Sequence, residues 1–166
     1  MSNAGSAWGS ASGDNPPCRL EFVQKAFIVK DGCLLLVRKA LTDPNHPGRW
    51  EVPGGRMLLG EDLDTHIQRE VFEETGISIK PDQPFELWQW EMGSGSPGSC
   101  GRAHVVAVAR RCTPLSDTLD SSHRRYDDHL DEAAWVPLEE INGYDILPDL
   151  KPVMATFFKD LDIALK

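Results

Sequence analysis

Apolar residues in this chain gather in short runs that predict β-strands. Residues 20–29 and 33–38 are two such runs, and they flank Asp31-Gly32, a dipeptide typical of a tight β-hairpin. The continuous apolar run at residues 103–109 predicts a central strand, buried on both faces. Shorter or alternating runs predict further strands at residues 85–92 and 134–136.

Two other stretches have the spacing of helices. Leu63, Ile67 and Val71 recur every fourth residue, which predicts a helix over residues 62–75 that ends at Gly76. A short helical turn is predicted at residues 137–141, and a final helix at residues 148–163 is predicted to bury Leu150, Val153, Met154, Phe157, Phe158 and Leu161. Strands before, between and after two helices predict an α/β fold with a mixed sheet covered by helices.

The length of the chain favours a single domain. Its 166 residues can enclose one core, and we assign that domain to residues 18–166. Residues 1–17 are small and polar, and we expect a flexible tail whose Ser2-Asn3-Ala4 looks like a remnant of an expression vector. No stretch approaches 18 uninterrupted apolar residues, so no membrane span is expected.

Charge and cysteine usage narrow the choice of partners. Seventeen basic against 26 acidic side chains give a net charge of −9, which argues against a nucleic-acid polymer as the main partner. A small phosphate ligand remains compatible, because a bound divalent metal inverts the local sign of an acidic site. Cys18, Cys33, Cys100 and Cys112 form no C-x-x-C pair, so we expect reduced thiols in a cytoplasmic protein and no zinc knuckle.

Three glutamates crowd the end of the first predicted helix. Glu70, Glu73 and Glu74 project from about one third of the helix circumference, where they repel one another. They also face the unfavourable end of the helix dipole. Taken alone, such a cluster is usually a solvated acidic face. A hard cation such as Mg²⁺ or Mn²⁺ would remove the conflict, and it prefers oxygen ligands.

The residues around this cluster favour the metal interpretation. Gly54-Gly55 lets backbone carbonyls approach a ligand or metal closely. Arg69 is positioned to pair with Glu61 or Glu73. Such a pair would orient one acid and leave the others for metal.

Together these residues resemble the Nudix box, G-x5-E-x7-R-E-U-x-E-E-x-G-U, where U is aliphatic. All nine defined positions match over 23 residues, namely Gly55, Glu61, Arg69, Glu70, Val71, Glu73, Glu74, Gly76 and Ile77. The resemblance extends over residues 20–160, including Trp135-Val136-Pro137. It implies an α/β/α sandwich with a mixed central sheet.

The resemblance also implies an activity, the attack of water on a phosphorus of a nucleoside diphosphate linked to a group X. Glu70, Glu73 and Glu74 would bind the catalytic Mg²⁺ or Mn²⁺, and the carbonyl of Gly54 or Gly55 would add a ligand. Arg69 and Glu61 would hold the loop and helix in shape. We take Glu70 as the expected general base, with Asp128 or Glu132 as a helper acid.

Other side chains are candidates for contact with substrate. Arg38 and Arg49 could bind phosphate, although a charged strand end is the more common role for such residues. Trp50 could stack on a base or belong to the core. Alternation places Trp88 and Trp90 on one face of a strand, where they could belong to the core, stack on a base or form a dimer surface.

Subfamily markers leave the substrate open, and we lean to a nucleoside triphosphate. The position where the ADP-ribose subfamily has a proline is Gly93 here. ADP-ribose, a nucleotide sugar or a coenzyme are alternatives, as is a non-catalytic module that senses a nucleotide. An isomerase would need a cysteine and an acid in the pocket, which this sequence does not supply convincingly. The resemblance leaves a homodimer open.

Overall fold

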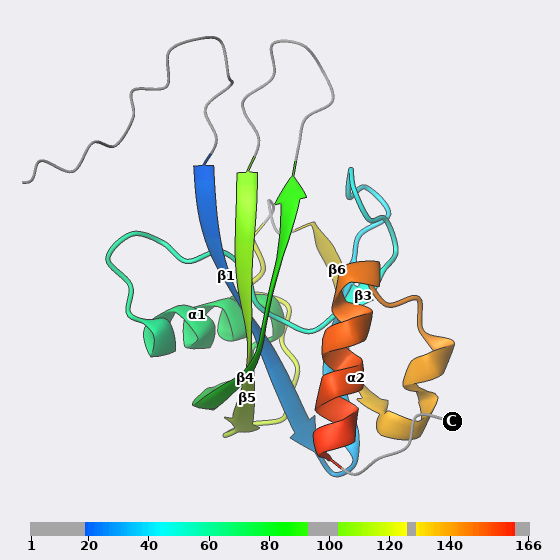
Figure 1. Ribbon diagram of the computed structural model, residues 1–166. Coiled ribbons are helices and arrows are strands. Elements are labelled where there is room, and N and C mark those ends of the chain that lie inside the picture. Colours follow the sequence, from blue (N-terminus) through cyan, green and yellow to red (C-terminus); the bar gives the residue numbers. More distant parts are fainter. Residues whose placement is uncertain (1–18, 93–102, 126–128, 162–166) are drawn as a thin grey trace, which may run out of the picture.

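Six strands and two α-helices make up the fold in the part of the chain that the computed structural model describes, residues 19–92, 103–125 and 129–161 (Figure 1). The strands are β1 (Arg19–Lys30), β2 (Cys33–Lys39), β3 (Trp50–Glu51), β4 (Ile79–Met92), β5 (Ala103–Pro114) and β6 (Leu130–Pro137). The helices are α1 (Leu63–Thr75), α2 (Lys151–Asp160) and the 3-10 helices η2 (Leu138–Gly143) and η3 (Pro148–Leu150). The predicted tail, residues 1–17, lies outside the described residues.

The sheet is mixed, as predicted, and β1 is the strand that joins its two parts. From Arg19 to Ile28, β1 pairs in parallel with β5, which in turn pairs antiparallel with β4. At its other end β1 pairs antiparallel with β2, and β2 pairs with both β3 and β6. The interior position of β5 agrees with the central strand predicted from its apolar run.

The hairpin between β1 and β2 turns at the predicted dipeptide. Asp31 has a φ of 49° and Gly32 a φ of 76°, so both central residues adopt the left-handed conformation of a type I′ turn. This turn brings Lys30 opposite Cys33 and sets the register of the pair.

Helix α1 begins and ends at its predicted signals. The Asp62 side chain accepts hydrogen bonds from the amides of Asp64 and Thr65, which caps the first turn. Gly76 ends the helix with a φ of 74°, and its N–H donates to the carbonyl of Phe72. The helix therefore matches the predicted span to within one residue.

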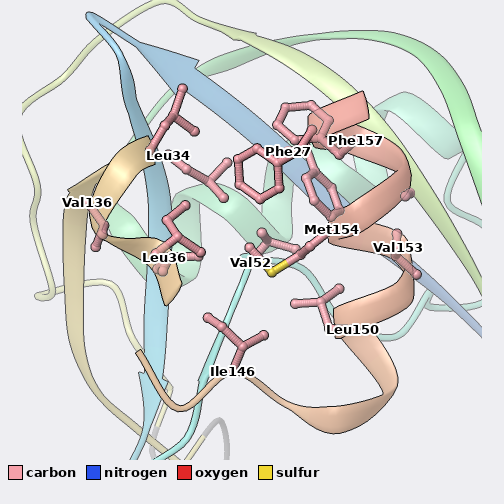
Figure 2. Packing of buried hydrophobic residues seen from close by; sticks show 14 residues of the cluster. Phe27, Leu34, Leu36, Val52, Val136, Ile146, Leu150, Val153, Met154 and Phe157 are labelled. Carbon is pink, nitrogen blue, oxygen red and sulfur yellow. The ribbon is translucent and has the colours of Figure 1, made fainter. Parts of the chain in front are cut away.

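The two helices cover opposite faces of the sheet, which confirms the α/β/α sandwich (Figure 1). Alternation along β1 explains the layers, since Ala26 and Ile28 pack under α1 while Phe27 packs under α2. Figure 2 shows the cluster beneath α2, where the Phe27 and Phe157 ring centroids lie 4.7 Å apart. Each fully buried side chain of this kind contributes about 1.5–3 kcal/mol.

Several predicted boundaries and burials were wrong. Strand β4 begins at Ile79 rather than at residue 85, because it lies at the edge of the sheet and tolerates Pro81 and Pro84 with shifts in register. Leu63 is 51% exposed although its spacing aligns it with buried Ile67 and Val71, because it lies in the first turn, at the end of α1. Leu161 is 36% exposed, because α2 ends at Asp160.

The predicted final helix divides into η3 and α2, whereas β5 and β6 are each longer than the apolar runs that predicted them. Polar residues extend both strands, because backbone pairing with neighbouring strands continues beyond the apolar positions. In the described part of the chain, no helix has the length and apolar character needed to cross a membrane.

Candidate active site

The Gly54–Gly55 turn lies between β1 and α1, where each glycine contacts a different buried glutamate of the helix. The Gly54 N–H donates to Oε2 of Glu74 at 2.8 Å. A Cβ on Gly54 would lie 2.2 Å from the carbonyl oxygen of Gln24, and φ at Gly54 is 129°. A Cβ on Gly55 would lie 2.5 Å from Oε2 of Glu70. The turn thus requires glycine twice, for backbone packing at Gly54 and for the carboxylate of Glu70 at Gly55.

Arg69 gathers three carboxylates around one guanidinium. Its Nε and Nη2 donate to the two oxygens of Glu61 at 2.5 and 3.0 Å, an arrangement that matches the planar fork. Its Nη1 donates to Glu70 Oε1 at 2.8 Å and to Glu73 Oε2 at 3.1 Å. The hydrogen bonds from Arg69 and the Leu58 amide hold the pKa of Glu61 at about 2. Arg69 therefore ties the loop before α1 to the helix.

Glu70 and Glu74 are acids whose burial opposes their charge. Both are less than 10% exposed, at 9% and 6%. Burial raises the pKa of Glu74 to about 8, although Lys25 opposes the rise and the Gly54 N–H opposes it too. Burial also raises the pKa of Glu70 above its usual value, against the opposing effect of Arg69. The neighbouring cations thus do not compensate for the burial of these two carboxylates, and such pairs are typical of functional sites.

A lysine–glutamate–lysine group centred on buried Glu51 supports the β1 side of the turn. Lys25 Nζ lies 2.5 Å from Glu51 Oε2 and donates to the Gly54 carbonyl at 2.7 Å. Lys39 Nζ lies 2.9 Å from Glu51 Oε1. Burial alone would raise the pKa of Glu51, but Lys25 and Lys39 hold it at about 2.

This group was not predicted from the sequence. Its one available signal was the charge of Lys25 within an apolar run, since a lysine there needs a partner. His66 was missed as well, although it is fully buried beside the turn.

The carboxylates of Glu70, Glu73 and Glu74 and the carbonyl of Gly54 have the chemistry of a divalent-cation site, because Mg²⁺ prefers oxygen ligands of these types. Within residues 19–92, 103–125 and 129–161, no three side chains of His, Cys, Asp or Glu stand close enough together to hold a metal ion. The predicted trio is therefore not preassembled. Arg69 binds Glu70 and Glu73, whereas Glu74 accepts from Gly54.

Of the other predicted site residues, Arg38 and Glu132 lie opposite each other on the paired strands β2 and β6. Arg38 is 2.8 Å from Asp131 and 3.0 Å from Glu132, and its guanidinium lies 5.6 Å from the centroid of the Trp50 ring. These acids already neutralise Arg38, so its phosphate contact and the helper role of Glu132 stay predictions.

The remaining predicted residues have partners outside the turn or lie outside the described residues. Arg49 pairs with Asp145 at 3.5 Å. Trp50 packs edge-on against Tyr144 at 5.2 Å, in the cluster beneath α2. Asp128 lies outside the described residues.

An apolar surface on the same face of the sheet as Lys25 carries two half-buried tryptophans. Trp88 and Trp90 stack at 6.2 Å and pack against buried Val23 and Ala107. Val23 alternates with Lys25 along β1, so both side chains point to this face. Trp88 also lines a pocket of about 400 Å³ between β4 and the start of α2.

The pKa of Glu74 predicts how stability depends on pH. A folded pKa of about 8 against a reference of 4.5 means that the free energy of unfolding decreases as pH rises from about 4.5 to about 8. Glu51 acts in a separate window, because its stabilisation is lost only as pH falls from 4.5 toward about 2.

Urea unfolding of the protein in a chelator, at about pH 6 and about pH 8, measures this decrease. Adding Mg²⁺ should restore stability at the higher pH, since a bound cation favours the ionised acid. Glu74→Gln should abolish the Glu74-dependent part of the decrease. An unchanged pH dependence in that variant would contradict the assignment.

Comparison with known proteins finds one domain family and several curated relatives. The family model of the NUDIX domain matches residues 25–161. A "MutT-like protein" of Streptomyces ambofaciens is 39% identical over 100 residues, which cover 60% of this chain and 55% of that protein. A "Nucleoside triphosphatase NudI" of Enterobacter is 25% identical over 72% of this chain and 84% of its own length.

Another curated relative is a "Putative 8-oxo-dGTP diphosphatase 2" of Mycobacterium tuberculosis. It is 40% identical over 59 residues, which cover 36% of this chain and 41% of that protein. The chain thus matches about half of the length of the Streptomyces and Mycobacterium proteins.

Solved structures agree with the fold. A MutT protein from Methanosarcina mazei has a TM-score of 0.65 at 25% identity, covering 91% of this chain and 99% of its own. A NUDIX hydrolase from Nitrosomonas europaea has a TM-score of 0.67 at 21% identity, covering 86% and 90%, and supports the fold alone.

Proposed function

The chain belongs to the NUDIX domain family, and we propose that it is a metal-dependent hydrolase that cleaves a pyrophosphate bond in a nucleoside diphosphate linked to X. The observation that carries this proposal is the pair of buried acids on one face of α1, Glu70 and Glu74, which contact Gly55 and Gly54 of the turn. Burial makes their charges costly, and a divalent cation would offset that cost.

We propose that Glu70, Glu73, Glu74 and the Gly54 carbonyl hold Mg²⁺, with Mn²⁺ as an alternative. Bound there, a divalent cation would polarise the phosphoryl oxygens and lower the pKa of the attacking water. Glu70 would accept the proton from that water, which suits a carboxylate whose pKa is raised by burial. Arg69 and Glu61 would keep Glu70 in place through the hydrogen bonds described above.

For the substrate, we propose a nucleoside triphosphate. Two relatives carry names of that class, a nucleoside triphosphatase and a putative 8-oxo-dGTP diphosphatase. The paired rings of Trp88 and Trp90 would suit a nucleobase, because aromatic side chains stack on bases of every kind. We also propose a cytoplasmic location, which the free thiols of Cys33 and Cys112 support among the described cysteines.

A panel of nucleotides tests this proposal. Nucleoside triphosphates, ADP-ribose, nucleotide sugars and coenzyme A are each incubated with Mg²⁺ or Mn²⁺ in ¹⁸O-labelled water, and the products are identified by mass. We expect a nucleoside monophosphate and pyrophosphate from a triphosphate, with label in one product. If ADP-ribose were cleaved in preference to the triphosphates, the proposed substrate class would be wrong. Nucleotide binding without turnover would overturn the proposal that the protein is an enzyme.

The two glycines of the turn predict two different defects. Gly55→Ala should fold, because its Cβ meets the movable carboxylate of Glu70, but it should lower kcat about 10²-fold by displacing that acid. Gly54→Ala should be strongly destabilised, because its Cβ meets the backbone of Gln24 and φ is 129°. Gly143→Ala, whose Cβ would meet nothing within 4 Å, is the control.

Thermal unfolding and steady-state kinetics separate these effects. Full activity in Gly55→Ala would contradict the position assigned to Glu70. Wild-type stability in Gly54→Ala would contradict the close approach of the turn to β1.

A further inference from the structure

His66 is a fully buried histidine in the first turns of α1, and the proposed reaction gives it no role. Its Nδ1 lies 2.8 Å from Nε2 of Gln24, a residue of β1 that is 42 positions earlier in the chain. Its Nε2 lies 3.0 Å from the carbonyl oxygen of Gly55. The ring therefore bridges the first strand and the catalytic turn.

The neighbours of Gln24 determine the direction of these hydrogen bonds. Gln24 Nε2 lies 2.8 Å from the carbonyl oxygen of Leu63, which can only accept, so the amide nitrogen must face it. The amide oxygen then faces Arg110 Nη1 at 3.4 Å, which can only donate. With this orientation, the second amide hydrogen of Gln24 points to His66 Nδ1.

The tautomer of His66 follows from this orientation. Because Nδ1 accepts from Gln24, the hydrogen of the neutral ring is on Nε2, and Nε2 donates to Gly55. The Gly55 carbonyl also accepts from the backbone N–H of Gln24 at 3.1 Å. Both lone pairs of this carbonyl are thus occupied by donors from buried residues.

Anchors further along the network keep Gln24 in place. Arg110 is largely buried, and it contacts Asp64 at 2.7 Å. Its Nε and Nη2 donate to the carbonyl of Asp82 at 3.0 and 2.8 Å. A continuous path of side chains therefore runs from Asp64 through Arg110, Gln24 and His66 to Gly55.

The position of the Gly55 carbonyl matters because the same turn contacts both buried acids. Gly54 donates to Glu74, and the Glu70 carboxylate lies against Gly55 where a Cβ would be. A rotation of this peptide would therefore change the contacts of both carboxylates with the turn at once. Displacements of about 1 Å at such a site cost about 10²-fold in rate.

We propose that His66 is a positioning residue, which donates from Nε2 to the Gly55 carbonyl and so holds the Gly54–Gly55 turn against Glu70 and Glu74. Gln24 selects the tautomer that can do this. The kinetic consequence rests on the proposed hydrolase function, whereas the tautomer and the hydrogen bond do not.

Two variants of similar size separate donation from packing. His66→Leu fills space without a donor, and it should lower kcat about 10–100-fold with KM changed less than about threefold, as expected for a residue behind the reacting groups. His66→Gln keeps a terminal N–H donor at similar reach, so it should recover most of kcat. Mn²⁺ affinity should weaken in His66→Leu and recover in His66→Gln. Equal losses in both variants, or wild-type kcat in His66→Leu, would overturn the proposal.

Long-range ¹H–¹⁵N correlation spectra of the unaltered protein give an independent readout. We expect His66 as the Nε2–H tautomer, and the Nδ1–H tautomer would overturn the proposal even if His66→Leu did not fold. If the hydrolase function itself is wrong, the wild-type protein shows no turnover while the tautomer is still Nε2–H. The two failures are thus distinguishable.

Discussion

Glu74→Gln is expected to lower kcat about 10³-fold or more, a loss of about 4 kcal/mol in transition-state stabilisation. Glutamine keeps the shape of the side chain and can still accept from the Gly54 N–H, but it cannot supply the negative charge that a divalent cation needs. The fold should survive, because burial already raises the pKa of Glu74 to about 8, so the metal-free protein holds this acid mostly neutral near pH 7. Activity and stability should therefore separate in this variant.

Steady-state kinetics and thermal unfolding of the same preparation measure this separation. Glu139→Gln is the matched control, because Glu139 is an exposed glutamate on η2, and it should behave as wild type. Turnover at the wild-type rate in Glu74→Gln would remove this residue from the site. A parallel loss of fold and activity would instead point to a structural role.

Lys25→Met is expected to give the largest loss of stability, about 3–5 kcal/mol, because it leaves Glu51 buried with one of its two cations. For a domain of this length, such a loss lowers Tm by roughly 6–20 °C. The carbonyl of Gly54 would lose its lysine donor at the same time. We expect activity to fall as well, since this donor supports the catalytic turn.

An exposed ion pair on the same strand provides the control for the buried Lys25–Glu51 pair. Lys30 pairs with Asp117 at the end of β1, where solvent screens the interaction, so Lys30→Met should leave Tm nearly unchanged. Adding Glu51→Gln to Lys25→Met should recover part of the loss, because the buried charge is then removed. Equal Tm values for Lys25→Met and Lys30→Met would contradict the supporting role of Lys25.

The helix and its acids could be predicted from the sequence because their signals are local. Asp62 and Gly76 mark the two ends of α1, and helical spacing brings Glu70 and Glu74 to one side. The pairing of Arg69 with Glu61 was also expected, and the structure shows it with two hydrogen bonds. These contacts span only one helix and the loop before it.

The support behind the turn could not be predicted, because its contacts are distant in sequence. Lys25 meets Glu51 across 26 residues, and Gln24 meets His66 across 42. In the pattern of apolar residues, both Gln24 and Lys25 are merely polar interruptions of a strand. Their roles depend on the pairing of β1 with the turn, which only the folded chain shows.

Titration with Mn²⁺, followed by electron paramagnetic resonance, tests the central claim most directly, namely that Glu70 and Glu74 hold a divalent cation. We predict saturable binding to the wild-type protein and its loss in the double variant Glu70→Gln/Glu74→Gln, with Glu139→Gln unaffected. Mn²⁺ binding to the double variant as tight as to the wild type would contradict the account.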